Sequence, residues 1–169
     1  SGRVTGVQTC ALPICCRQFR FLLFRMLPVT ADFMRIKNGC KKMDTKELAK
    51  KTGETAKLYF STVKDEDKPY NLWQYFDKNL AKDMSLYITG QMYAREKIPH
   101  TTRQLITVAA LTVLSKPDEL KLHIHAALNV GCTKEEIAEV IFQTSIYGGV
   151  PAANTALAAL KDVLEERGE

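Results

Sequence analysis

The chain has 169 residues, which is the length of a single domain with one hydrophobic core. Its formal net charge is +5, and a basic balance raises the question of a nucleic acid or an anionic membrane as partner. The excess is confined to residues 1–42, which carry eight Lys or Arg residues and one Asp, whereas residues 43–169 carry 16 basic and 18 acidic residues. We therefore expect the domain to bind neither a nucleic acid nor a membrane.

Residues 4–14 read VTGVQTCALPI, and all eleven match the in-frame translation of a common sequencing adapter. We interpret residues 1–42 as an artefactual or non-native leader, with Met43 as the start of the domain. The alternative is a signal or transit peptide, but Arg20 and Arg25 flank the short apolar run FLLF, and a secretory segment needs about 7–15 uninterrupted apolar residues.

No run approaches the roughly 20 apolar residues of a membrane span. Four of the five cysteines lie in the leader, so the domain contains only Cys132. One cysteine cannot form an intramolecular disulfide framework, and we expect a cytosolic location. A small buried thiol is favoured over a reactive one at Cys132.

The first half of the domain predicts two helices separated by a loop. Residues 43–60 predict a short helix that Gly53 interrupts, and the charged, proline-containing residues 64–71 predict a loop. Residues 72–94 then carry an apolar side chain at every fourth position, which predicts one long helix with a stripe facing the core. The aromatic and Met content of this stripe also fits a ligand-binding surface, but core packing is favoured.

The second half has stronger helix signals. Residues 103–114 are apolar nearly all round, as in a buried helix, although their β-branched content would also allow a strand. The next helix begins at Pro117 and ends at Gly131. A Thr133–Glu136 capping box opens another helix. A Gly-Gly-Val-Pro joint precedes the last helix, whose alanines allow two helix axes to approach closely. We therefore predict one all-α domain over residues 43–169.

Glu119 and His123 are four residues apart on the helix that begins at Pro117, and so lie on one face. A carboxylate beside an imidazole orients it and favours its protonated form, which suits general acid–base catalysis. An ordinary surface pair is the alternative, and spacing alone favours it. His125 points roughly to the other side, so the two histidines cannot bind one metal ion, and we expect no metal site.

Two further residues are candidates for substrate binding. Arg103, at the start of its helix, can bind a carboxylate through two hydrogen bonds, or can pair with a structural Asp or Glu. Tyr147, next to the Gly-Gly joint, can place its hydroxyl in a pocket or simply pack. We also consider His125 a substrate-binding candidate.

Four segments occur in an order and spacing that resemble the carboxymuconolactone decarboxylase family over roughly residues 72–164: TRQLITVAALTVL, ELKLH, AALNVGCTKEEIAEV and IYGGVPAANTAL. The resemblance implies a compact helical fold that assembles into homotrimers or homohexamers. One branch of the family decarboxylates 4-carboxymuconolactone in aromatic degradation, without a cofactor. The other branch, the alkylhydroperoxidases with peroxiredoxin-type activity, uses a Glu, a C-x-x-C pair and a His in a thiol relay.

Counting back from His123 by the spacing of that relay, its Glu falls on Gln104 and its cysteines on Lys116 and Glu119. A thiol relay needs a thiolate and a resolving thiol, and neither is present there. The resemblance therefore implies a cofactor-independent decarboxylase of a carboxylated lactone, with His123 as acid, Glu119 orienting it and Arg103 holding a carboxylate. The alternatives are a different carboxylated or lactone substrate, the alkylhydroperoxidase activity, and a non-catalytic oligomeric binding protein.

Overall fold

The structure is a computed structural model that describes residues 44–169. The interpretation of residues 1–42 as a leader lies outside the described residues. Within the described range every regular element is helical, which confirms the all-α prediction. The elements in chain order are α2 (Thr45–Phe60), η2 (Asp65–Asp67), α3 (Pro69–Phe76), α4 (Lys78–Ser85), η3 (Leu86–Tyr93), α5 (His100–Val113), α6 (Pro117–Asn129), α7 (Lys134–Gly148) and α8 (Val150–Arg167).

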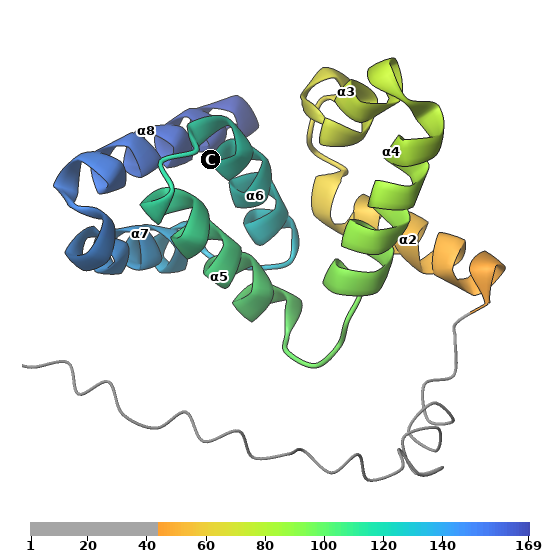
Figure 1. Cartoon of the computed structure of the whole chain (residues 1–169). Coiled ribbons are helices and arrows are strands. Elements are labelled where there is room, and N and C mark those ends of the chain that lie inside the picture. The colour runs from red at the N-terminus through yellow and green to blue at the C-terminus, as the bar shows by residue number, and fades with distance from the viewer. Residues whose placement is uncertain (1–43) are drawn as a thin grey trace, which may run out of the picture. The chain divides into compact units, whose positions relative to one another are not determined.

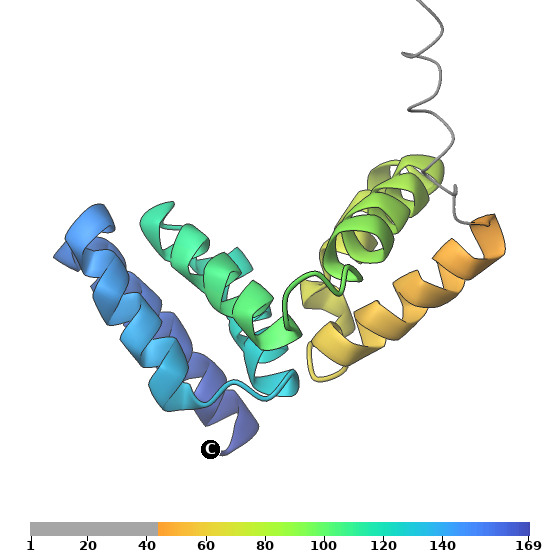
Figure 2. The same ribbon diagram turned by 90° about the horizontal axis from the view of Figure 1, so that it is seen from below.

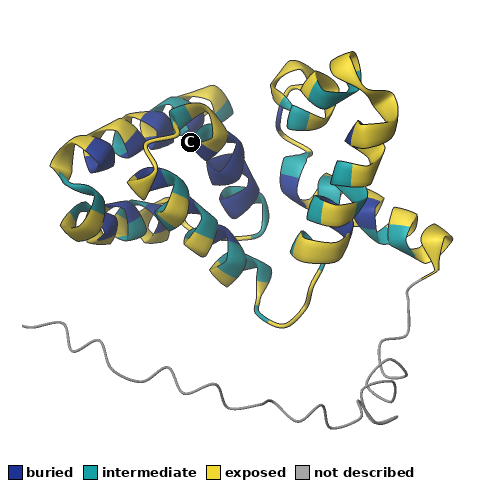
Figure 3. Cartoon of the chain, in the orientation of Figure 1, coloured by how far each residue is buried: buried dark blue, intermediate teal, exposed yellow. Residues whose placement is uncertain are grey.

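Helices α5 to α8 pack against one another around a shared apolar core (Figures 1 and 2). Helix α6 is the most enclosed of them, because the six consecutive residues from Leu122 to Ala127 are all buried (Figure 3). A helix buried on several sides must carry its polar side chains into the interior, and both histidines of α6 are among these residues. The completely buried side chains of the core include Val108, Leu120, Ile124, Ile137 and Ile141.

The helix ends that the sequence predicts around α6, α7 and α8 are confirmed. The Thr133 hydroxyl accepts a hydrogen bond from the Glu136 amide at 3.1 Å, and the Glu136 carboxylate accepts one from the Thr133 amide at 2.8 Å. Gly131 has a φ of 96° and Gly149 a φ of 83°, a region of backbone conformation that favours glycine. The small residues of α8 that face the core are Ala152, Ala153, Ala156 and Ala159, all buried.

Helix α2 packs against η3 and α6, and a glycine of η3 allows the first of these contacts. A Cβ atom on Gly90 would lie 2.2 Å from Thr52 Oγ1 and 3.0 Å from Leu48 Cδ1, so only a residue without a side chain fits. The prediction that Gly53 interrupts α2 is wrong. The helix continues through it, because contact with two neighbouring elements outweighs the low helix propensity of one glycine.

The prediction of one long helix over residues 72–94 with a core-facing stripe is also wrong. Asp77 has an extended backbone, and its Oδ1 accepts hydrogen bonds from the amides of Asn79 and Leu80 at 2.8 and 2.9 Å. This cap starts a new helix, so α3 ends at Phe76 and α4 continues into the π-helical segment η3. Leu72, Phe76 and Leu80 are 61%, 79% and 56% exposed and do not reach the core.

The charged stretch 64–71 is only partly a loop. It contains the short helix η2, and α3 already begins at Pro69. Among the helices of residues 44–169, none is both long enough and apolar enough to cross a bilayer.

The close approach at Gly90 leads to a stability prediction. We expect Gly90→Ala to lower the free energy of unfolding by roughly 1–3 kcal/mol, because the added methyl group must displace Thr52 from its hydrogen bond to Leu48 O. Gly53→Ala is the matched control, since its Cβ would meet nothing within 4 Å. We expect this change to raise stability by up to about 1 kcal/mol. Chemical denaturation of both variants measures the difference, and equal effects would contradict the prediction.

Candidate functional site

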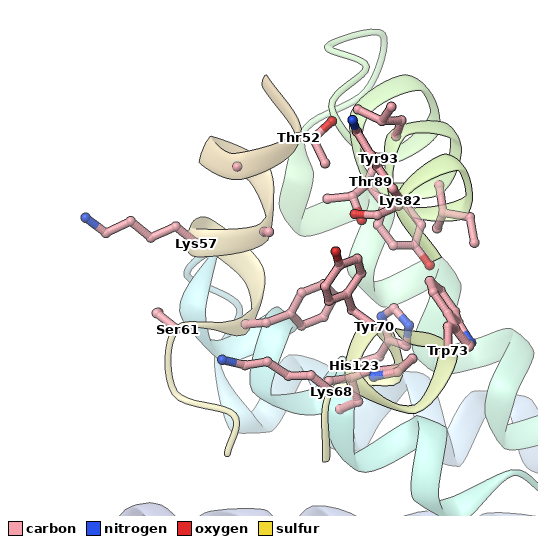
Figure 4. Close-up of a pocket in the computed structure, with 18 of the residues that line it drawn as sticks. Thr52, Lys57, Ser61, Lys68, Tyr70, Trp73, Lys82, Thr89, Tyr93 and His123 are labelled. Carbon is pink, nitrogen blue, oxygen red and sulfur yellow. The ribbon is translucent and has the colours of Figure 1, made fainter. Parts of the chain in front are cut away.

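A pocket of about 730 Å³ is lined by residues of α2, α3, α4, η3 and α6 (Figure 4). Of the five predicted site residues, the structure brings two to this pocket, His123 and Glu119. Much of its wall is apolar or aromatic, including Phe60, Tyr70, Trp73, Leu86, Ile88, Tyr93 and Leu122. A concave apolar surface with a few polar groups is the usual form of a small-molecule site.

His123 lies deep in this pocket and is only 8% exposed. Its Nδ1 atom is 3.0 Å from Oε1 of Gln104, which projects from α5 and is completely buried. The rings of Phe60 and Tyr93 stand nearly perpendicular to the imidazole, with centroids 6.1 and 5.9 Å away. The imidazole is therefore held by one hydrogen bond and two aromatic contacts.

Burial lowers the pKa of His123 from 6.5 to about 4, so its imidazole is neutral at pH 7. With the Gln104 oxygen facing Nδ1, this nitrogen carries the hydrogen and donates it. Nε2 then keeps its lone pair and can accept a hydrogen bond or a proton. In its resting state the site therefore presents an acceptor.

The structure corrects the predicted relation between Glu119 and His123. Within the described residues, Glu119 forms neither a hydrogen bond nor an ion pair with the imidazole, and its side chain is exposed. Spacing places both on one side of α6, but the His123 ring packs toward Gln104 on α5, where burial outweighs any influence of the carboxylate. Gln104 positions the ring, and the neutral form is favoured over the protonated one.

A second polar contact, which is partly buried, joins Tyr59 of α2 to His100 of α5. The Tyr59 hydroxyl is 2.6 Å from His100 Nδ1, and the Tyr59 ring packs against those of His100 and Tyr93. Burial raises the pKa of Tyr59, and the side chain of Gln104 and the charge of Arg103 partly oppose this. Tyr59 thus ties α2 to the start of α5 through His100.

Gln104 is the principal site residue that the sequence analysis did not assign. Two signals pointed to it: it occupies the Glu position of the thiol relay, and it lies in the largely apolar second part of α5, where a buried amide requires a partner. Its Oε1 has that partner in His123, whereas its Nε2 is buried without one among the described residues.

Arg103 and Tyr147 do not line the pocket. Arg103 Nη2 donates a hydrogen bond to the carbonyl oxygen of Arg95 at 2.6 Å, so it ties the start of α5 to the preceding turn. Tyr147 lies at the end of α7 and is 76% exposed. In this chain neither side chain reaches the space in front of His123.

His125 is also absent from the pocket, because it points from α6 toward α8. Its Nε2 is 3.6 Å from a Glu166 carboxylate oxygen, and its Nδ1 is 3.5 Å from Thr62 Oγ1. Burial, together with the nearby charge of Arg167, lowers its pKa, and Glu166 acts in the opposite direction. The divergence of the two histidines that the sequence predicts is confirmed.

Among residues 44–169, the cationic groups that line the pocket are Lys57, Lys68 and Lys82, and the only acidic one is Glu119. Lys68 is paired with Asp65 at 2.6 Å. The pocket therefore has an excess of positive charge. No group of three or more His, Cys, Asp or Glu side chains within residues 44–169 is arranged to hold a metal ion.

Cys132, the only cysteine of the described part, lies outside the pocket and is buried, as predicted. Its sulfur is 3.6 Å from the carbonyl oxygen of Thr101. Burial raises the pKa of the thiol, and the nearby Glu136 adds to this. A raised pKa disfavours the thiolate that thiol chemistry requires.

Comparison with known proteins identifies the family to which this chain belongs. A 4-carboxymuconolactone decarboxylase of Acinetobacter baylyi is 36% identical to this chain over 93 residues, which are 55% of the chain and 69% of that protein. The chain belongs to the carboxymuconolactone decarboxylase family. The model of that family matches residues 79–162. This confirms the membership that the sequence motifs predicted.

The chain is also similar to a second protein, an uncharacterized 15.0 kDa protein in the nqo9-nqo10 intergenic region of Paracoccus denitrificans. It is 42% identical over 83 residues, which are 47% of the chain and 61% of that protein. The carboxymuconolactone decarboxylase family match contains Gln104, Glu119 and His123, whereas the pocket residues of α2 and α3 precede it.

The burial of His123 predicts a specific pH dependence of stability. The unfolded chain binds a proton at this residue below about pH 6.5, but the folded protein does so only near pH 4. Stability is therefore lost as the pH falls from 6.5 to 4, by at most about 3 kcal/mol from this residue. We expect His123→Gln to remove this part of the loss. The free energy of unfolding of the variant therefore rises relative to that of the wild type as the pH falls.

The measurement is urea denaturation of both proteins between pH 4 and pH 7. Lys161→Gln is the control, because it changes an exposed side chain outside the pocket and leaves both histidines of α6 in place. Parallel stability curves for the wild type and His123→Gln would contradict the low pKa.

Proposed function

We propose that this protein is a cofactor-independent carboxy-lyase that decarboxylates a carboxylated lactone, 4-carboxymuconolactone or a close relative, with His123 delivering the proton. The observation that carries the proposal is a buried, neutral imidazole positioned by Gln104 in an apolar pocket with an excess of lysines. Family membership and the similarity to a protein named 4-carboxymuconolactone decarboxylase support the same reaction class.

The pocket suits the electronic demand of decarboxylation. The carbon–carboxylate bond breaks, carbon dioxide leaves, and the electron pair passes into the conjugated system of the lactone. Negative charge on the reacting carboxylate is dispersed in this step, so apolar surroundings favour the transition state over the ground state. Phe60, Tyr93 and Leu122 supply such surroundings next to His123, and the lysines supply attraction for the anion.

The reaction consumes one proton, which must reach the carbon that becomes protonated. The resting imidazole has a pKa of about 4 and does not carry that proton at pH 7. A bound anion next to the ring raises this pKa, because an opposite charge favours the protonated form. Nε2 therefore takes a proton from water when the substrate binds and transfers it to the carbanion. His123 then returns to its neutral state.

Gln104 and Glu119 have different parts in this proposal. Gln104 Oε1 accepts the Nδ1 hydrogen in both protonation states of the ring, so it positions His123 throughout the reaction. Glu119 contributes its exposed charge at the pocket wall and does not orient the ring. Arg103, the predicted carboxylate ligand, is replaced in this role by the pocket lysines.

The alkylhydroperoxidase alternative is less well supported. The two positions where the relay would need thiols hold Lys116 and Glu119, and the thiol of Cys132 is buried outside the pocket with a raised pKa. A thiolate and a resolving thiol near His123 are the minimum for that mechanism.

We also propose that the chain forms a homo-oligomer, a trimer or a hexamer. Several large apolar side chains remain exposed where the end of α5 meets the α7–α8 joint, and a Cβ atom on Gly148 would lie 3.2 Å from Val113 Cα. Exposed apolar surface of this kind is typical of protein–protein contacts. The side chains are Val113, Leu114, Ile146, Tyr147 and Val150. This gives Tyr147 an interface role in place of substrate binding.

A set of three variants tests the decarboxylase proposal. We expect His123→Gln to lower kcat for decarboxylation of 4-carboxymuconolactone by roughly 100- to 10,000-fold, because it removes the proton donor. Glu119→Gln should lower it by less than about tenfold, since an exposed charge has a weak effect. His125→Gln, whose side chain faces α8, is the control and should leave kcat unchanged. Carbon dioxide release is the readout, and wild-type turnover by His123→Gln would disprove the assignment.

The oligomer proposal is tested by light scattering after size-exclusion chromatography. We expect the wild type to have three or six times the mass of one chain. The double variant Leu114→Asp with Ile146→Asp should have a lower mass, because it places charge in the apolar contact. Leu72→Asp, on exposed α3, is the control and should not change the mass. An unchanged mass of the double variant would place the contact elsewhere.

A further inference from the structure

The pocket is larger than a simple carboxylated lactone requires. Its volume of about 730 Å³ lies within the roughly 300–1,000 Å³ of pockets for drug-sized ligands, and such ligands have more non-hydrogen atoms than a small acid does. A five-membered lactone bearing two acid groups has about a dozen such atoms, so it leaves much of a pocket of this size unfilled. The pocket therefore has room for a body larger than this lactone.

Aromatic side chains define the shape of that space. Tyr70 and Trp73 of α3 line the pocket together with His123, and Tyr93 of η3 contacts the His123 ring (Figure 4). With Phe60, these residues bring four aromatic rings to the pocket. Aromatic walls favour a flat apolar body that can pack face to face or edge to face.

Two of the three positive charges that residues 44–169 contribute to the pocket lie away from Trp73. Lys57 and Lys68 extend toward the same side of the pocket, opposite Trp73 (Figure 4). Lys57 forms no ion pair within residues 44–169, and Lys68 is paired only with Asp65, which is itself exposed. Two ammonium groups on one side attract an acid group that is distant from the reacting carboxylate.

We propose that the ligand of this pocket is a carboxylated lactone with a flat, conjugated body larger than that of 4-carboxymuconolactone, with one acid group next to His123 and a second, remote one at Lys57 and Lys68. This rests on the proposed function for the reacting carboxylate and adds the size and shape of the substrate. Binding energy from the remote acid and the flat body would then offset the cost of placing the reacting carboxylate among apolar side chains.

The position of these residues along the chain supports a specificity role. Lys57, Phe60, Lys68 and Trp73 all precede residue 79, where the family match begins, whereas His123 lies within it. The segment shared with the family thus carries the proposed chemistry, and α2 and α3 determine which molecule reaches it.

Titration calorimetry with stable probes tests this inference without turnover. The probes are 2,6-naphthalenedicarboxylate, which is flat with two separated acids, 2-naphthoate, which lacks the second acid, and adipate, which lacks the flat body. We expect the naphthalene diacid to bind at least ten times more tightly than either other probe. The double variant Lys57→Gln with Lys68→Gln should remove this advantage over 2-naphthoate, and Trp73→Ala should remove the advantage over adipate. Lys161→Gln, an exposed lysine of α8 outside the pocket, is the control and should bind like the wild type.

Equal affinities for the three probes, or an unaltered affinity in the lysine double variant, would overturn the inference. This outcome is separable from a failure of the proposed function. If the small lactone is decarboxylated but the naphthalene diacid does not bind, only the inference about size and shape is wrong. If the diacid binds as expected but no lactone is decarboxylated, the ligand class is supported and the reaction assignment is wrong.

Discussion

The hydrogen bond between Gln104 Oε1 and His123 Nδ1 joins α5 to α6 at a depth where Gln104 is completely buried and His123 is only 8% exposed. A buried imidazole without a partner would be costly, and so would a buried amide oxygen, so each residue satisfies the other. The bond also determines which ring nitrogen faces the ligand space. The charge state of His123, the position of its free nitrogen and the packing of Phe60 and Tyr93 all depend on this contact.

The helices that form the site have different tasks. Helices α5 to α8 form a tightly packed core in which the alanines of α8 allow close approach, and this core holds His123 in place. Helices α2, α3, α4 and η3 complete the wall of the pocket and contribute most of its aromatic and cationic side chains. A substitution in the second group can therefore alter ligand choice while the buried pair of Gln104 and His123 stays intact.

The sequence was sufficient where local chemistry decides the structure. The capping box at Thr133, the positive φ of Gly131 and the small residues of α8 all act within one or two helical turns, and each is confirmed. The prediction of one long helix over residues 72–94 was wrong because the pattern of an apolar residue at every fourth position continues across a helix break. The Asp77 side chain starts a new helix there, and the apolar residues of the first part stay exposed.

The site was predictable only in part for a related reason. Glu119 and His123 are close in sequence and do share the pocket, but the charge state of the ring depends on burial by residues from α2, η3 and α5, which spacing cannot show. Packing between distant segments also places Trp73 in the same pocket as His123. It is the single tryptophan of the chain and it lies in the pocket wall, so its indole emission is a built-in optical reporter that responds to ligands at this one place.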